Sequence, residues 1–223
     1  MTEKSTQAHK TLYQDPTFSD ITIRQTFQGK HREYLAHKAV LCNHSGWFMR
    51  ALTGNFKESA ENTIEVHDDN PEAFEAMMYF FYHMDFDKQS GLFDKTRNPR
   101  SLIEELTDIV DCYSLADKYD AGPFLDALLE RFKQVTAPFS GNLTENNIKM
   151  LVHAHYPYCT APMCSMSEPL VSFMFKNDGV EIFGSKMVQE LILQYGNFGT
   201  DLLVLGMRTG KLTAPKLWNP ILW

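Results

Sequence analysis

The sequence has few cysteines and no excess of positive charge, and these two scarcities exclude several classes of protein. Its four cysteines, in a chain of 223 residues, are too few and too scattered for a disulfide framework, so we expect free thiols. The formal net charge of −7 argues against the broad basic surface that binds nucleic acid or an anionic membrane. We therefore expect neither as a partner.

Long apolar runs are also missing. No stretch approaches the roughly 20 apolar residues that a membrane-spanning helix needs, and the first five residues do not open a signal peptide. We therefore expect a cytoplasmic and/or nuclear protein. Asn142-Leu143-Thr144 has the pattern of a glycosylation site, but without secretion it is better interpreted as a helix start.

Catalytic motifs are the third absence. The sequence contains no nucleophile elbow, no phosphate-binding glycine loop and no His-Glu-x-x-His. The acidic pairs Asp68-Asp69 and Glu104-Glu105 are expected to be solvated at helix starts, where the helix dipole favours carboxylates. We therefore expect a protein that is not an enzyme and binds no cofactor, with a site hidden in residues 138–223 as the alternative.

One stretch of the chain collects possible metal ligands. Its four nitrogen and sulfur donors are His153, His155, Cys159 and Cys164. Zinc prefers such donors in tetrahedral sites. Their spacing matches no common zinc finger or ribbon, and the two prolines nearby can shape the loop without a metal. We expect no metal here, and zinc is the alternative.

The first patterned stretch predicts two strands followed by helices. Ile21 and Ile23 alternate with polar residues, the period of a strand with one buried face. Gly29 and Lys30 fall where a hairpin would turn. From Ala36 onward the period becomes helical, and Gly54 is expected to end the helices.

A third strand and a buried helix follow. The strand is expected around Ile64 and Val66, and Asn70-Pro71 supplies a helix N-cap and a first-turn proline. The apolar residues then keep the helical period, at Phe74, Met77, Met78, Phe81 and Tyr82. Because this helix has more large apolar residues than one stripe needs, some are expected to contact another element or a partner.

These residues, in this order, resemble the BTB/POZ domain. The resemblance rests on Phe18-Ser19-Asp20, Leu35 to Leu41, Ser45 with Phe48, Phe56 to Ser59, Ile64-x-Val66, Pro71 with Phe74, and Tyr82, and it continues through Leu115 to Tyr119. It implies an α+β fold, a helical cluster flanked by a small mixed sheet, over residues 15–135. Residues 1–14 are expected to be flexible, and residues 87–100 form an inserted polar loop that departs from the family pattern.

The resemblance also implies where a second copy binds. In dimeric members the segment before the first strand packs across the two-fold axis, a role that falls here to Leu12, Tyr13 and Phe18; packing on their own subunit is the alternative. Positions matching Asp20 and Lys38 line a charged pocket near the dimer contact. The alternative is that Asp20 caps a turn and Lys38 points to solvent.

His37 and Leu41 belong to the same implied interface. No second ligand lies at helical spacing from His37, so we expect a structural histidine that bonds to the backbone rather than a metal ligand or a catalytic group.

A second partner surface is implied near the start of the next helix. In cullin-binding relatives a hydrophobic-x-acidic motif there contacts the scaffold, and Leu102-Ile103-Glu104 has that form. Ser101 and Glu104 also form a capping box, which explains the glutamate without a partner. Met84 and Phe86 are the other residues expected at this surface.

The helical period continues to the C-terminus. Gly122-Pro123 separates two helices, and residues 136–223 are expected to be a mostly helical C-terminal extension. This extension is the expected surface for an unknown protein partner, because the chain has no recognisable kelch repeat, MATH domain or zinc finger. The aromatic tail, residues 216–223, is expected to dock on its own fold, or alternatively on a partner.

The sequence therefore predicts a non-enzymatic protein-protein interaction protein that forms a homodimer. Two narrower alternatives remain: a substrate adaptor that binds a cullin scaffold of a ubiquitin ligase, and a BTB-type transcriptional co-regulator that acts through another DNA-binding protein.

Overall fold

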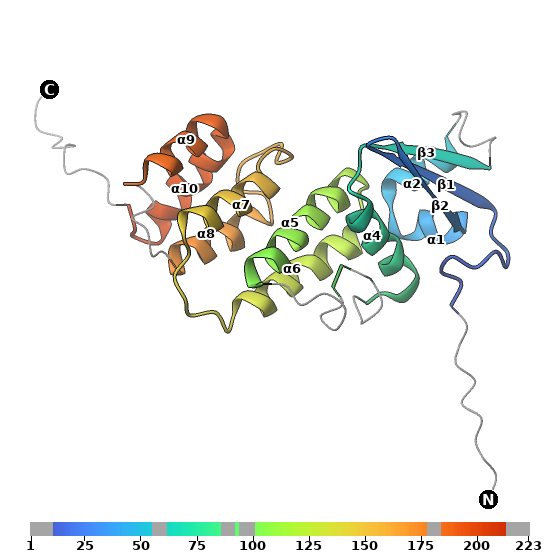
Figure 1. Ribbon diagram of the computed structural model, residues 1–223, viewed down its shortest axis with the longest axis horizontal. Helices are drawn as coiled ribbons and strands as arrows, with labels where there is room; N and C mark the ends of the chain where they lie inside the picture. The colour runs from blue at the N-terminus through green and yellow to red at the C-terminus, as the bar shows by residue number, and fades with distance from the viewer. Residues whose placement is uncertain (1–10, 55–61, 86–91, 94–100, 178–183, 213–223) are drawn as a thin grey trace, which may run out of the picture. The chain divides into compact units, whose positions relative to one another are not determined.

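The structure is a computed structural model (Figure 1). It describes residues 11–54, 62–85, 92–93, 101–177 and 184–212. The described residues contain nine helices and one three-stranded sheet, which confirms the predicted α+β class. Some predicted features lie outside them: Phe86, the Phe56 to Ser59 motif, most of the 87–100 loop and the C-terminal tail.

The chain divides into two compact units. Unit 1 comprises residues 1–99 and 115–126, and unit 2 comprises residues 100–114 and 127–223. The chain crosses between the units within two helices, so each of these helices contributes residues to both.

The sheet of unit 1 is mixed, with strand order β2-β1-β3. The central strand β1 (Ile21–Phe27) pairs antiparallel with β2 (Lys30–Ala36) and parallel with β3 (Thr63–His67). Ile21 and Ile23 are both buried, which confirms the predicted alternation.

The turn between β1 and β2 has two residues. Gln28 has a φ of 48° and Gly29 a φ of 76°, and Phe27 on one side pairs with Lys30 on the other. Two consecutive positive φ angles match the twist of a hairpin, and glycine adopts them without a steric cost. Gly29 therefore lies in the turn as predicted, but the position predicted for Lys30 is wrong, because Lys30 pairs with Phe27 and begins the second strand.

Two short helices follow the hairpin, α1 (Lys38–His44) and α2 (Gly46–Thr53). Ser45 lies between them, and its hydroxyl accepts a hydrogen bond of 3.1 Å from the backbone N–H of Phe48. This N-cap satisfies one of the unpaired amides at the start of α2. The helix ends before Gly54, as predicted.

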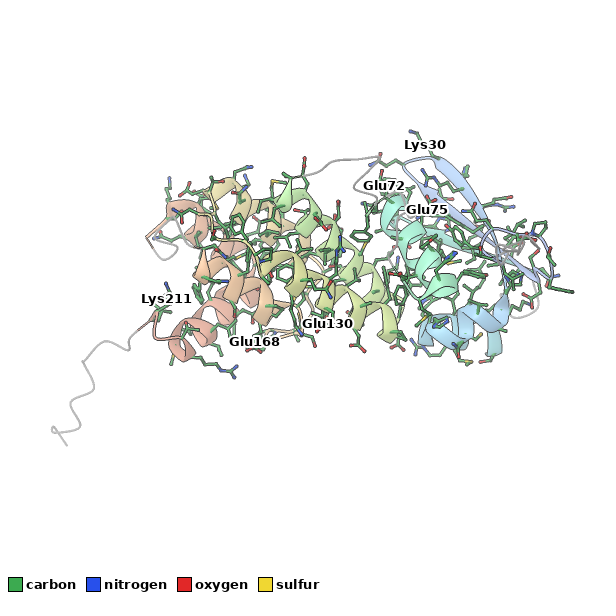
Figure 2. All side chains as sticks on the ribbon, turned by 90° about the horizontal axis from the view of Figure 1, so that it is seen from below. Lys30, Glu72, Glu75, Glu130, Glu168 and Lys211 are labelled. Carbon is green, nitrogen blue, oxygen red and sulfur yellow. The ribbon has the colours of Figure 1, made fainter. Side chains whose placement is uncertain are left out.

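Helix α4 (Pro71–His83) begins at the predicted N-cap, because the Asn70 side chain accepts hydrogen bonds from the first backbone amides. Most of its apolar residues are buried: Ala73, Phe74, Ala76, Met77, Met78, Phe80 and Phe81. On its polar face, Glu75 forms an ion pair of 2.9 Å with Arg32 of the edge strand β2. Figure 2 labels Glu75 and its neighbour Glu72 on this helix.

The two long helices are α5 (Leu102–Lys118) and α6 (Gly122–Thr136). The capping box predicted before α5 is present, since Glu104 accepts from the Ser101 N–H at 2.8 Å and the Ser101 hydroxyl accepts from the Glu104 N–H at 3.3 Å. In unit 2, Arg131 of α6 pairs with Glu105 of α5 at 2.7 Å.

The C-terminal extension is helical, as predicted. Its helices are α7 (Glu145–His155), α8 (Ser167–Lys176), α9 (Lys186–Gln194) and α10 (Gly196–Arg208). Helix α10 packs against α8 and α9, and α7 also packs against α9 (Figure 1, yellow to red). No helix in the described ranges is both long and apolar enough to cross a membrane.

Candidate functional site

The segment before β1 is attached to unit 1 by the ring of Tyr13. This ring makes edge or tilted contacts with Tyr79, Tyr82 and His83 of α4, with centroid distances of 5.4, 5.8 and 5.8 Å. Burial, together with the negative charge of Glu75, raises the pKa of Tyr13 well above its ordinary value. Tyr13 therefore packs on its own subunit and anchors this segment.

His37 provides the second anchor. Its Nε2 lies 2.8 Å from the carbonyl oxygen of Thr17, so Nε2 carries the proton and donates. Its Nδ1 lies 2.9 Å from the Tyr82 hydroxyl oxygen. The same oxygen accepts a 3.0 Å hydrogen bond from the His37 backbone N–H. The ring is only 6% exposed, and burial raises the pKa of Tyr82 to about 12. His37 therefore has the contacts expected of a structural histidine, because its ring donates to a backbone carbonyl oxygen.

Asp20 reaches the backbone at the start of α1 rather than the Lys38 ammonium. Its Oδ1 accepts a hydrogen bond of 2.7 Å from the Lys38 N–H, and the residue is exposed. The described side chains of Asp20 and Lys38 do not form an ion pair. In this chain, taken alone, Asp20 acts as a cap for the helix start.

The anchored segment presents a large apolar side chain to solvent. Phe18 is 85% exposed, with a φ of 59°, and Leu12 is 39% exposed. Met84, the left-handed C-cap of α4 and the neighbour of His83, is 53% exposed. Leu41 differs from these residues because it is fully buried inside the fold. Phe18 is thus the most exposed of the apolar residues that were expected at a partner surface and that the structure describes.

The second expected partner surface lies at the start of α5. Leu102 is partly buried and Glu104 is exposed. The Glu104 carboxylate accepts hydrogen bonds from both the N–H and the hydroxyl of Ser101, at 2.8 and 2.9 Å. Its position is therefore fixed by helix capping.

Sequence reasoning missed a buried polar cluster in unit 1. The expectation that Asp69 is solvated is wrong, because this residue is only 5% exposed. Its carboxylate accepts hydrogen bonds from the Tyr119 hydroxyl at 2.6 Å and from the Lys118 ammonium at 2.5 Å. Gln25 of β1 donates to the Asp69 carbonyl at 3.1 Å. The Lys118-Tyr119 pair, which carried part of the family resemblance, therefore stabilises the loop before α4.

The acidic residue Glu105 also departs from the solvated position expected for it. It is partly buried and paired with Arg131 in unit 2. For both Asp69 and Glu105 the partner lies more than 25 positions away in the sequence, so no local pattern reveals it.

Unit 2 contains a second group of reactive side chains. The ligand atoms of His155, Cys159 and Cys164 lie within 4.8 Å of one another. His153 is not part of this group, because its Nδ1 lies 2.9 Å from the Tyr195 hydroxyl. Three of the four possible metal ligands noted in the sequence therefore converge.

The two thiols of this cluster differ electrostatically. Burial of Cys164 favours its neutral form, but the hydrogen bonds to His155 and Ser167 outweigh burial and lower its pKa to about 7. Burial and the negative charge of Cys164 raise the pKa of Cys159 to about 11. The pair thus favours one thiolate, on Cys164, near neutral pH.

The mixed sheet, the buried helix after it and the segment before β1 all lie within residues that match one known domain family. A family model of the BTB/POZ domain matches residues 9–134, more than half of the chain. The chain therefore belongs to the BTB/POZ family, whose domain is a protein-protein interaction module and is generally not enzymatic.

Several curated proteins are similar to this chain. A BTB/POZ domain-containing protein of Arabidopsis thaliana is 26% identical over 163 residues, which cover 67% of this chain and 18% of the relative. TD and POZ domain-containing protein 4 of Mus musculus is 32% identical over 71 residues, 32% of this chain and 18% of the relative. Kelch-like protein 25 of Xenopus tropicalis is 24% identical over 193 residues, 83% of this chain and 31% of the relative. The chain thus spans less than a third of the length of each of these relatives.

Proposed function

We propose that this BTB/POZ protein self-associates as a homodimer through the anchored segment of unit 1, residues 12–20. The observation that carries the proposal is the exposure of Phe18, at 85%, on a segment whose neighbours Tyr13 and Thr17 are held by α4 and by His37. A fixed segment loses little further conformational entropy on binding.

In an isologous contact each subunit would contribute its own Phe18, because a two-fold axis brings the same surface of both copies together. Burying one phenylalanine side chain contributes roughly 1.5–3 kcal/mol, so two contribute enough to decide whether a dimer persists at micromolar concentration. Leu12, which is 39% exposed on the same segment, is a second exposed apolar side chain.

Size-exclusion chromatography with light scattering tests this surface. In Phe18→Ser the dimer dissociation constant should rise about 100-fold or more, because both copies lose the buried ring. Leu193→Ser is the matched control, since Leu193 is 87% exposed but belongs to α9 of unit 2. A Phe18→Ser protein that dimerises as tightly as the control would contradict the proposal.

We propose as a second candidate that the chain docks on a cullin scaffold as an adaptor. What favours this role is that the similarity to a Kelch-like protein covers 83% of the chain, more than the BTB match alone. Met84 is 53% exposed at the end of α4 and is the described residue of the expected surface with the largest exposed apolar side chain.

A pull-down with purified cullin scaffolds tests the adaptor role. Met84→Asp should abolish retention, because a carboxylate would be buried without a partner in the contact. Met207→Asp, at a methionine of α10 that is 56% exposed, should retain it. If the wild-type protein is not retained by any cullin, this candidate fails while the dimer proposal stands.

A further inference from the structure

The loop between α7 and α8 in unit 2 is held in place by buried polar contacts. Asp201 of α10 is fully buried and accepts hydrogen bonds from the Met163 N–H at 2.6 Å and from the Tyr156 hydroxyl at 3.0 Å. The Asn197 side chain donates to the Cys159 carbonyl at 2.8 Å. These contacts fix the backbone on which Cys159 and Cys164 lie.

Two of the three donor pairs are separated by distances close to those of a tetrahedral zinc site, and all three donor atoms lie within 4.8 Å of one another. His155 Nε2 lies 3.3 Å from Cys164 Sγ, and the sulfur atoms of Cys159 and Cys164 lie 3.9 Å apart. Zinc bond lengths in tetrahedral geometry place nitrogen and sulfur ligands about 3.6 Å apart and two sulfur ligands about 3.8 Å apart. Cys164 is therefore already at ligand distance from both other donors, and an ion fits once His155 and Cys159 also reach that separation.

His155 is oriented toward this position. The residue is 2% exposed, and its ring is held by edge contacts with Tyr113 and Tyr156, at centroid distances of 6.3 and 4.8 Å. Its Nε2 faces two thiols and the Ser167 hydroxyl, which are weak or adaptable partners for a buried nitrogen. Its Nδ1 is buried and has no hydrogen-bond partner in the described part of the chain. Packing against the two tyrosine rings, rather than a carboxylate hydrogen-bonded to Nδ1, therefore sets the ring orientation.

We propose that His155, Cys159 and Cys164 bind one zinc ion. An imidazole and two thiolates are the ligands that zinc prefers, and three protein ligands leave the fourth position to water. Both cysteines are partly exposed, so solvent reaches that position, and the Ser167 hydroxyl, 3.2 Å from Cys164 Sγ, is close enough to orient the water. The ion would join the end of α7 to the loop that α10 holds.

Metal analysis of the full-length protein under reducing conditions, after dialysis against zinc and then against buffer, tests the proposal. We expect one zinc per chain, and cobalt(II) added to the metal-free protein should give thiolate charge-transfer absorption and the ligand-field bands of a tetrahedral site. Cys164→Ser and Cys159→Ser should each lose stoichiometric binding.

Two control variants separate this site from general metal affinity. Cys42→Ser removes a partly exposed cysteine of unit 1, and His153→Gln removes the histidine that is bonded to Tyr195 instead. Both should keep one zinc per chain, with circular dichroism confirming that all four variants are folded. Zinc absent from the reduced, folded wild-type protein, or retained equally in folded Cys164→Ser, would overturn the proposal.

Discussion

Asp69 has a buried carboxylate that two side chains contact, Lys118 at the end of α5 and Tyr119 directly after it. Lys118 neutralises its charge at 2.5 Å, and the Tyr119 hydroxyl donates at 2.6 Å. Burial and the charge of Asp69 raise the pKa of Tyr119 far above its ordinary value, so the hydroxyl keeps the proton it donates. The cluster fixes the turn that leads into α4.

Tyr119→Phe should lower the free energy of unfolding by about 2 kcal/mol, because a buried carboxylate loses a hydrogen bond. Chemical denaturation monitored by circular dichroism measures the change. Tyr158→Phe, at a tyrosine that is 66% exposed, is the control and should differ little from wild type. Equal stability of the two variants would show that the hydroxyl does not stabilise the cluster.

Asp111 gives the protein a pH-dependent stability. Burial, and next the negative charge of Asp108, raise its pKa to about 6 in the folded state, against about 3.9 in an unfolded chain. Above pH 6 the folded state must hold a partly buried charge that the unfolded state solvates. This group therefore favours the folded state below about pH 4, and that contribution is lost as the pH rises to 6.

Asp111→Asn should flatten this part of the stability profile and raise the free energy of unfolding at pH 7, on the order of 1–2 kcal/mol. Urea unfolding at a series of pH values from 4 to 7 would show it. Asp117→Asn changes an exposed aspartate on the same helix and should keep the wild-type slope. If the free energy of unfolding of Asp111→Asn varies with pH as steeply as that of the wild type, other groups cause the pH dependence.

At the scale of single elements, local chemistry decides where the helices begin. Thr144 accepts a hydrogen bond from the Asn147 N–H at 3.2 Å, and the Asn147 side chain accepts one from the Thr144 N–H at 2.9 Å. This reciprocal capping box satisfies two amides at the start of α7. It also explains why the Asn-Leu-Thr pattern marks a helix start.

Thr144→Ala should lower the free energy of unfolding by about 1 kcal/mol, because α7 loses its N-cap. Thermal or denaturant unfolding measures the loss. Thr200→Ala, at an exposed threonine inside α10, leaves every helix cap intact and should change stability by less than about 0.5 kcal/mol. If both variants lose the same amount, the cap is not the cause.

The elements could be predicted from the sequence where the signal was local. Asn70 with Pro71, and Ser101 with Glu104, specify helix starts within four residues, and the alternation around Ile21 specifies a strand. The environment of Asp69 could not be predicted, because its partners lie at the end of α5 and directly after it, 49 and 50 positions later in the sequence. Such pairings depend on the tertiary fold.

The candidate sites also depend on contacts between residues that are far apart in the sequence. The family resemblance pointed to the segment around Phe18, but not to its attachment through Thr17, His37 and Tyr82. The spacing of these residues matches no common zinc motif, so the sequence argued against a metal site. The structure differs because His155 lies at a helix end and the cysteines lie on a loop whose shape Asp201 fixes. Only the folded chain brings those donors together.

At the scale of the whole molecule, the chain joins a BTB/POZ domain to a helical extension. The domain is an interaction module, and its anchored segment with the exposed Phe18 is the surface proposed for a second copy. The extension carries the proposed zinc site. The two proposals thus fall on separate parts of the chain, self-association on unit 1 and zinc binding on unit 2.

The most direct test of the central claim is the mass of the wild-type protein in solution, measured by sedimentation equilibrium over a dilution series. A homodimer should give a species of twice 25.7 kDa that persists to low micromolar concentration and dissociates to the monomer on further dilution. A mass of 25.7 kDa at every concentration would contradict self-association.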